Sequence, residues 1–256
     1  PVRAGAGVVQ LFRIALGPSI VWDVVAGWAL WRMAGQGEGL GSLPAALSVA
    51  ILAYHGGMAL NDWADRRIDF DAGRRRPLVL GHLNPSAALS AGLLMLAGAA
   101  LLAAWILPHA LAPACILAGV VLTYDFGGSP IRIFLGPILL ATARVLAFHM
   151  AALGEAEWGT VFSHIGLAPG AALAVWWLFL SRLASYEENG APGMYILAFP
   201  AILSLVPLMV SEQAGGNPWF FGLWAGLGLR LLIPAWGDRY RGPVPAAVQA
   251  AVRRAL

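Results

Sequence analysis

Eight apolar stretches, each long enough or nearly long enough to cross a lipid bilayer, make up most of this sequence. They cover residues 7–31, 44–60, 86–107, 111–124, 133–153, 160–181, 194–211 and 218–236. A spanning helix needs about 20 apolar residues, and fewer where one end is buried in protein. Charged residues make up only 11% of the chain, whereas soluble domains average about 25%. The sequence therefore predicts an all-α, polytopic membrane helix bundle in which residues 1–256 form a single domain.

The arginines predict the orientation of this bundle, because cytoplasmic loops of membrane proteins carry an excess of positive charge. If the N-terminus is cytoplasmic, the loops on that side hold twelve arginines, and the opposite side holds only Arg32. These cytoplasmic segments are 1–6, 61–85, 125–132, 182–193 and 237–256. We therefore expect a multi-pass protein of the cell inner membrane with its polar loops in the cytoplasm. Residues 242–256 are typical of the first turns of another helix, so we also expect a ninth span.

The segment 61–76 contains four aspartates and five arginines, out of 16 basic and 13 acidic residues in the whole chain. If it continues the helix of the second apolar stretch, one face about 100° wide contains Asn61, Asp62, Asp65 and Asp69. Carboxylates on one face repel one another, and a divalent cation relieves that repulsion. Carboxylate oxygens suit Mg²⁺, which completes its coordination shell with substrate phosphate oxygens. A plainer alternative is a solvated acidic helix end paired with arginines, for which Asp62 and Arg66 have the right i, i+4 spacing.

The same segment resembles a known family. NDWADRRID (61–69) fits the N-D-x-x-D-x-x-x-D signature of the UbiA superfamily of intramembrane prenyltransferases, and RRRPLVLGHL (74–83) resembles the R-P-L/I-x-x-G element that follows it there. The resemblance implies a fold of nine transmembrane helices around a central cavity. It also implies that Arg76 lies near the diphosphate of a prenyl donor, which is bound through Mg²⁺ by Asn61, Asp62, Asp65 and Asp69.

Two further stretches extend the resemblance. Residues 11–27 are similar to the family's first helix, particularly in an EboC-like subgroup that has an aspartate at the position of Asp23. Residues 124–152 resemble the Tyr-Asp, Gly-Pro and Ala/Cys-Arg elements of that subgroup. A lysine usually follows the tyrosine in the family, and Arg132 is the nearest cation here. The resemblance therefore implies substrate-binding roles for Asp23, Tyr124, Arg132 and Arg144.

The second aspartate motif of the family is where this sequence departs from the pattern. Residues 180–192 occupy its place, but the two aspartate positions hold Arg182 and Tyr186. The nearest carboxylates are Glu187 and Glu188. We expect Glu187 to complete the metal site and Arg182 to contact the substrate.

Polar and aromatic residues within the apolar stretches leave two interpretations open. An intramembrane charge such as Arg144 is a functional hypothesis by default, whereas Asp23 fits either an acceptor-binding group or an ion pair between helices. His55 lies two turns deeper than Asp62 on nearly the same face, where it either lines the pocket or packs between helices. Three aromatic residues either stabilise a prenyl carbocation or pack against lipid and other helices: Trp176, Trp177 and Phe179.

Together these residues predict Mg²⁺-dependent transfer of a prenyl group from an isoprenoid diphosphate to a lipophilic acceptor at the cytoplasmic membrane face. Mg²⁺ and arginines stabilise a leaving diphosphate, and a membrane cavity excludes the water that would trap the carbocation. One alternative is a catalytically degenerate UbiA-like protein that holds a lipid, pigment or quinone, or that serves as a structural subunit of a membrane complex. A third hypothesis, a transporter, has only the intramembrane charges in its favour. No sequence feature indicates a nucleic-acid partner.

Overall fold

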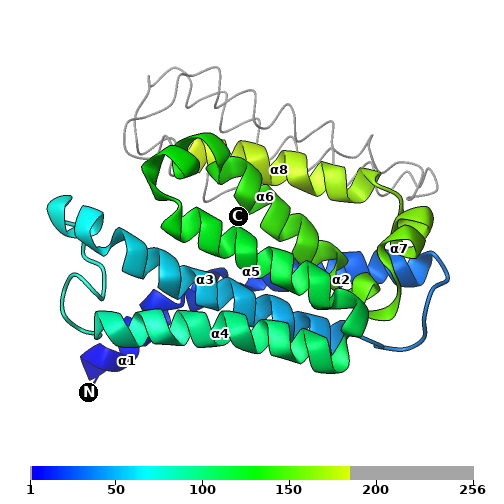
Figure 1. Ribbon diagram of the computed structural model, residues 1–256, viewed down its shortest axis with the longest axis horizontal. Helices are drawn as coiled ribbons and strands as arrows, with labels where there is room; N and C mark the ends of the chain where they lie inside the picture. Colours follow the sequence, from blue (N-terminus) through cyan, green and yellow to red (C-terminus); the bar gives the residue numbers. More distant parts are fainter. Residues whose placement is uncertain (1, 185–256) are drawn as a thin grey trace. The chain divides into compact units, whose positions relative to one another are not determined.

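The computed structural model describes residues 2–184 (Figure 1), and these residues fall into two compact units. Residues 2–135 and 142–164 form the first unit, and residues 136–141 with 165–184 are the described part of the second. Within residues 2–184 all regular secondary structure is helical. The structure therefore confirms the predicted all-α class.

The helices follow one another with short connections. In chain order they are α1 (Val2–Leu11), the 3₁₀ helix η1 (Ile14–Leu16), α2 (Gly17–Met33), α3 (Leu43–Asp71), α4 (Pro85–Ile106), the 3₁₀ helix η2 (Pro108–Ala110), α5 (Leu111–Phe126), α6 (Gly128–Glu155), α7 (Trp158–Ile165) and α8 (Ala168–Ala184).

Four of the predicted spans are present as helices that are long and apolar enough to cross a membrane. They are α3, α4, the run Pro108–Phe126 that includes α5, and the run Pro130–Glu155 of α6. They correspond to the apolar stretches 44–60, 86–107, 111–124 and 133–153. The stretches 194–211 and 218–236, and the tail expected to begin a ninth span, lie outside the described residues.

The first predicted span, 7–31, is not one continuous helix. Between α1 and α2 the backbone of Arg13 is left-handed, with φ +46° and ψ +47°. Pro18 lies in the first turn of α2, where a proline favours a helix start because its missing N–H would be unpaired there anyway. The apolar length of the stretch gives no sign of such a break, so the sequence alone does not locate it.

The sixth predicted span, 160–181, is also divided into two helices. α7 ends at Ile165, and Gly166 follows with φ +75°, a left-handed conformation that glycine adopts without steric cost. Pro169 lies in the first turn of α8, again a favoured position for proline. Gly166 and Pro169 thus separate two helices where the apolar run predicts one.

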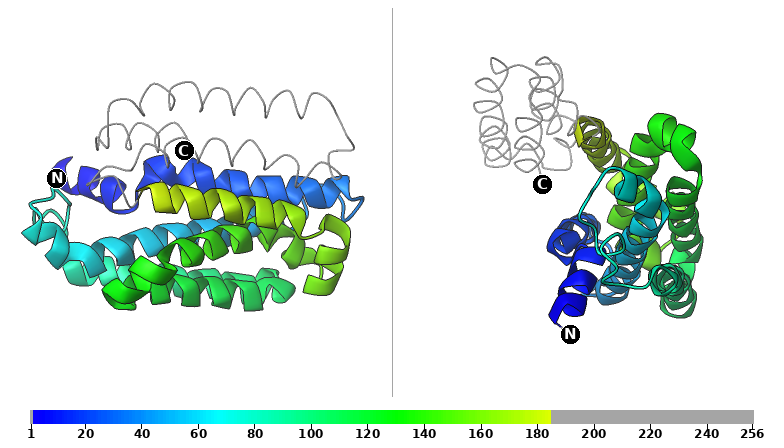
Figure 2. Two further views of the ribbon diagram at one scale, coloured as in Figure 1. Left: turned by 90° about the horizontal axis from the view of Figure 1, so that it is seen from above. Right: turned by 90° about the vertical axis from the view of Figure 1, so that its left-hand side faces the viewer.

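The polar motif lies on α3, which packs against α2, α4 and α5 in the first unit. Figures 1 and 2 show α3 and α4 side by side. Their contact is close, because a Cβ atom on Gly92 of α4 would lie 2.6 Å from Leu60 Cγ and 3.0 Å from the carbonyl oxygen of Gly56. Small residues allow helices in lipid to approach in this way.

α1 and the loop after α3 lie at the same end of the first unit as the motif (Figure 2). Leu11 at the end of α1 is buried in a cluster with Ala59, Leu78 and Ala88. These residues come from α1, α3, the following loop and α4. The cluster therefore brings Arg13, two residues beyond α1, next to the polar end of α3.

Candidate functional site

The motif residues are helical, as the sequence predicts, because α3 continues without a break to Asp71. The helix ends where Gly73 takes φ +64° and the Arg74 N–H donates to the carbonyl oxygen of Asp69 over 2.9 Å. This is the hydrogen bond of a glycine-terminated helix. It places the arginines of residues 74–76 back against the helix that carries the aspartates.

Each aspartate of the motif faces an arginine. Asp62 Oδ1 lies 3.1 Å from Arg13 Nη2 and 3.9 Å from Arg76 Nη1. The side chain of Asp62 is 1% exposed, so these two guanidinium groups supply its nearest positive charges. Since Arg13 comes from the turn after α1, the ion pair joins two segments that are far apart in the sequence.

Asp69 is paired in the same manner at the end of the helix. Its Oδ1 accepts a hydrogen bond of 2.8 Å from Arg74 Nη1, and its Oδ2 lies 3.8 Å from Arg76 Nε. Arg76 thus lies between two buried carboxylates, those of Asp62 and Asp69.

Arg132 on α6 pairs with the remaining motif aspartate, Asp65. Its Nε and Nη2 donate to the backbone carbonyl oxygens of Tyr124 and Asp125, each over 2.9 Å. Its guanidinium carbon also lies 5.4 Å from the centre of the Tyr124 ring. The structure therefore brings residues 124–132 to the polar end of α3, as the predicted topology requires.

Two residues of this site were not assigned from the sequence. One is Arg13, and the other is Asp125, which is 5% exposed and whose Oδ1 accepts from Asn61 Nδ2 over 3.3 Å. A signal for Arg13 was present, because a charge within an apolar stretch needs a partner. Arg13 lies within the first apolar stretch, and Asp125 directly follows the fourth.

The aspartates do not form one three-carboxylate group. Among residues 2–184, no three Asp, Glu, His or Cys side chains gather closely enough to hold a metal ion together. The expectation that Asp62, Asp65 and Asp69 hold one ion together therefore stays a prediction. In this structure an arginine neutralises each carboxylate separately, which relieves the repulsion among carboxylates on one helix face.

A smaller set of oxygens nevertheless fits a cation. Arg13 Nη2 contacts Asp62 Oδ1 at 3.1 Å and Asn61 Oδ1 at 3.5 Å, so two oxygens face one positively charged nitrogen. Asp62 Oδ2 is buried and has no hydrogen-bond partner among the described residues. Mg²⁺ commonly takes one or two protein oxygens and fills its other positions with water and phosphate. Asn61 and Asp62 therefore match the donor set of such a site, and Asp65 and Asp69 lie further along the same helix.

No protein-family model matches the sequence, and no curated protein sequence matches it. Solved structures do match the fold, and two of them are described here. A digeranylgeranylglyceryl phosphate synthase superposes with a TM-score of 0.66 at 12% sequence identity, over 98% of this chain and 93% of that chain. A UbiA homolog from Archaeoglobus fulgidus, bound to DMAPP and Mg²⁺, superposes with a TM-score of 0.62 at 15% identity, over 97% of each chain.

The chain has the UbiA fold. The resemblance seen in the sequence is thus confirmed at the level of the fold, and the chain is a multi-pass membrane protein. The EboC-like subgroup stays a prediction.

The intramembrane charges of this UbiA fold form an ion pair between α2 and α6. Arg144 Nε lies 2.5 Å from Asp23 Oδ2, and Arg144 Nη2 donates to the carbonyl oxygen of Ser19 over 2.7 Å. Both charged residues are buried. Of the two interpretations of Asp23, the ion pair between helices is therefore present in the structure, and a role of either residue toward a substrate stays a prediction.

Two other polar residues of α3 also have partners of their own. His55 Nδ1 donates to the carbonyl oxygen of Phe12 over 2.6 Å, since a carbonyl only accepts, so this histidine supports the turn at Arg13. Arg66 donates to the carbonyl oxygen of Trp63 and lies 4.1 Å from the centre of its ring. The plainer alternative of aspartates paired with arginines is thus partly right, but the partner of Asp62 is Arg13 and not Arg66.

The remaining predicted residues belong to the second unit or lie beyond the described part. Arg182 is in the last turn of α8, and Trp176, Trp177 and Phe179 are on the same helix. Glu187 and Glu188 lie outside the described residues, so the substitute for the second aspartate motif stays a prediction.

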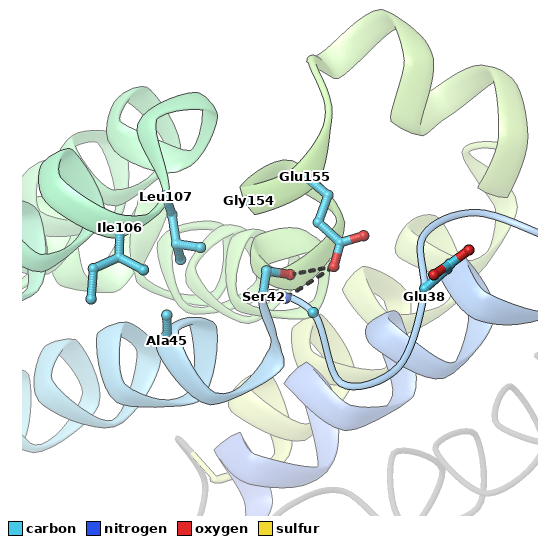
Figure 3. A pocket seen from close by; sticks show the side chains of 8 residues that line it. Glu38, Ser42, Ala45, Ile106, Leu107, Gly154 and Glu155 are labelled. Atoms are coloured by element: carbon cyan, nitrogen blue, oxygen red, sulfur yellow. Dashed lines mark hydrogen bonds between the residues drawn. The ribbon is translucent and has the colours of Figure 1, made fainter.

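A separate pocket of about 320 Å³ lies at the other end of α3, beside Ser42 (Figure 3). Among the residues that line it, Glu155 accepts hydrogen bonds of 2.6–3.0 Å through its carboxylate. The donors are the N–H and Oγ of Ser42, Trp31 Nε1 and both terminal nitrogens of Arg32. These bonds fasten the loop between α2 and α3, so Glu155 is a structural acceptor. Ser42 precedes Asp62 by 20 helical residues, or about 30 Å at 1.5 Å per residue, so this pocket is distinct from the motif site.

Proposed function

We propose that this chain is a Mg²⁺-dependent prenyltransferase, which transfers a prenyl group from an isoprenoid diphosphate to a lipophilic acceptor at the cytoplasmic face of the inner membrane. The observation that carries the proposal is the convergence of Asn61 Oδ1 and Asp62 Oδ1 on one cationic nitrogen, surrounded by arginines within a UbiA fold. The solved UbiA homolog bound to DMAPP and Mg²⁺ supports it.

The reaction requires stabilisation of two opposite charges. The C1–O bond of the donor breaks, the diphosphate leaves with both electrons, and a nucleophilic atom of the acceptor bonds to C1 and gives up a proton. Bound Mg²⁺ supplies a Lewis acid that neutralises the leaving diphosphate. Arg13 and Arg76, which lie beside Asp62, can donate to the same diphosphate oxygens once the carboxylate binds the metal.

Arg132 has a different role in this proposal. Its nitrogens are held by Asp65 and by the carbonyl oxygens of Tyr124 and Asp125. It keeps α3 and the start of α6 together, so Asp65 and Tyr124 are presented on the same side of the site. Glu187 and Arg182 would face the diphosphate from the segment that replaces the second aspartate motif.

The second candidate is a catalytically degenerate protein that holds a lipid, pigment or quinone, alone or within a membrane complex. The pairing of Asp62, Asp65 and Asp69 with arginines favours it, because paired carboxylates are stable without a metal. The buried Oδ2 of Asp62, which has no hydrogen-bond partner among the described residues, favours the enzyme.

Binding and turnover of a prenyl diphosphate test the proposal. The purified protein is titrated with geranylgeranyl diphosphate, with and without Mg²⁺, and release of diphosphate is then measured with membrane lipid extracts as acceptor. Asp62→Asn and Asp65→Asn should each weaken Mg²⁺-dependent binding at least about tenfold. Asp71→Asn is the matched control, since Asp71 is exposed on the same helix end. Unchanged binding in both site variants would show that these aspartates serve only their arginines, and binding without turnover would favour the degenerate protein.

A further inference from the structure

The side-chain amide of Asn61 lies between two different partners. Its Nδ2 lies 3.3 Å from Asp125 Oδ1, and its Oδ1 lies 3.5 Å from Arg13 Nη2. A carboxylate accepts hydrogen bonds and donates none, and a guanidinium donates and does not accept. Both neighbours therefore favour the same orientation of the amide, with its NH₂ group toward Asp125 and its oxygen toward Arg13.

This orientation decides what Asn61 offers to a ligand. Arg13 Nη2 is also 3.1 Å from Asp62 Oδ1, so the amide oxygen and the neighbouring carboxylate oxygen face a common point. Two such oxygens are ligands for a hard cation. If the amide were reversed, an NH₂ group would face that point and would repel a cation.

Asp125 is itself held in place. Asp125 is buried at the end of α5. Its backbone carbonyl oxygen accepts a hydrogen bond of 2.9 Å from Nη2 of Arg132, whose guanidinium also pairs with Asp65. The same Arg132 nitrogen lies 4.0 Å from Asp125 Oδ1. The carboxylate of Asp125 is thus fixed by α5 and α6, while the amide that it contacts belongs to α3.

We propose that Asp125 is a positioning residue, which orients the Asn61 amide so that Asn61 Oδ1 and Asp62 Oδ1 together face the metal ion. The inference rests on the proposed function, because that ion is the Mg²⁺ that would accompany the diphosphate. Groups behind a metal ligand fix its orientation, and their loss typically costs about 10–100-fold in metal affinity. Asp125 does not contact the metal or the substrate in this arrangement.

A double-mutant cycle separates orientation from general support of the fold. Mn²⁺, which also prefers oxygen ligands, is bound in the presence of inorganic diphosphate, and its affinity is measured by electron paramagnetic resonance without any turnover. Asp125→Leu removes the acceptor at similar size, and Asn61→Ala removes the amide. Each single change should weaken Mn²⁺ binding about tenfold or more. The double variant should bind as weakly as Asn61→Ala alone, because there is then no amide to orient.

Several outcomes overturn the inference. Losses that multiply in the double variant would mean that Asp125 acts independently of Asn61, and an Asn61→Ala variant with unchanged affinity would mean that the amide is not a ligand. Asp125→Asn keeps an oxygen that can accept from Asn61. The Mn²⁺ affinity of this variant should therefore stay within about threefold of the wild-type affinity, whereas loss of the orienting group should lower the affinity about tenfold or more. This variant also tests the inference if Asp125→Leu does not fold, because a loss as large as that of Asn61→Ala would contradict it.

The cycle also distinguishes this inference from the proposed function. A wild-type protein that binds no Mn²⁺ with diphosphate would overturn both. A wild-type protein that binds it, with losses that multiply in the double variant, would overturn only the role of Asp125.

Discussion

Arg13 and Asp62, which are 49 residues apart in the sequence, form an ion pair with 3.1 Å between Arg13 Nη2 and Asp62 Oδ1. The backbone of Arg13 is left-handed, a conformation that disfavours any residue with a Cβ atom. Contacts from α3 hold this turn on both sides, since His55 donates to the carbonyl oxygen of the preceding residue, Phe12. A strained residue that is held by its surroundings is a common feature of functional sites.

Substitutions of Arg13 separate this backbone strain from the ion pair. Arg13→Ala and Arg13→Gly both remove the guanidinium, so both should weaken Mg²⁺-dependent binding of a prenyl diphosphate. They differ only in backbone freedom, and the glycine variant should be more stable than the alanine variant by about 1 kcal/mol. The measurement is the free energy or midpoint of unfolding in detergent. An alanine variant as stable as the glycine variant would contradict a left-handed Arg13.

The contact between α2 and α6 leaves no room for a side chain at Gly27. A Cβ atom there would lie 1.7 Å from the carbonyl oxygen of Phe148, and backbone cannot move aside as a side chain can. Gly27→Ala should therefore destabilise the protein by about 3 kcal/mol, the upper end of what overpacking usually costs. Gly119→Ala on α5 is the control, since nothing in the described structure lies within 4 Å of its added Cβ, and it should be neutral or slightly stabilising. Thermal unfolding of the two variants in the same detergent checks this, and equal midpoints would disprove the close contact.

The bonds of Glu155 should matter for stability and not for ligand binding. Glu155→Gln removes the charge opposite Arg32 and part of the hydrogen-bond accepting capacity of the side chain. Since a hydrogen bond to a charged group contributes about 1.5–3 kcal/mol to the free energy of unfolding, this variant should be less stable by about that amount. Glu38→Gln changes an exposed carboxylate of the same pocket, so it should stay within about 0.5 kcal/mol of the wild type. Both variants should bind prenyl diphosphate normally where they are folded, because the pocket lies about 30 Å from Asp62 along α3. A loss of binding in folded Glu155→Gln would link the two ends of the first unit.

Glu187 is expected to replace the missing aspartate of the second motif. Glu187→Gln should remove most turnover of prenyl diphosphates, because it takes a carboxylate from the expected metal site. Glu188→Gln is the control next to it, and on a helix its side chain would point about 100° away. Normal turnover in Glu187→Gln would show that the second motif is not rebuilt from this residue. Equal losses in both variants would indicate a loop that turns both carboxylates inward.

The parts of this protein that depend on local properties are predictable from its sequence. Each of the helices α3, α4, α5 and α6 contains most or all of one predicted apolar stretch, because length and hydropathy are enough to identify a spanning helix. The helical continuation through the motif was also predicted correctly. The breaks at Arg13 and Gly166 were missed, since a single left-handed residue leaves the hydropathy of its stretch unchanged.

The class of the fold and the helices that carry the chemistry follow from the amino-acid sequence alone. So does the face of α3 that carries Asn61, Asp62, Asp65 and Asp69. This is because these features depend on neighbours within a few turns. The partners of these residues depend on the packing of the helices, which pairs Asp62 with Arg13, Asp65 with Arg132 and Asn61 with Asp125. These contacts join residues 49, 67 and 64 positions apart. These contacts depend on how α1, α3, α5 and α6 pack. The spacing of the aspartates on α3 predicts that they repel one another, but it does not predict which arginines of other elements neutralise them.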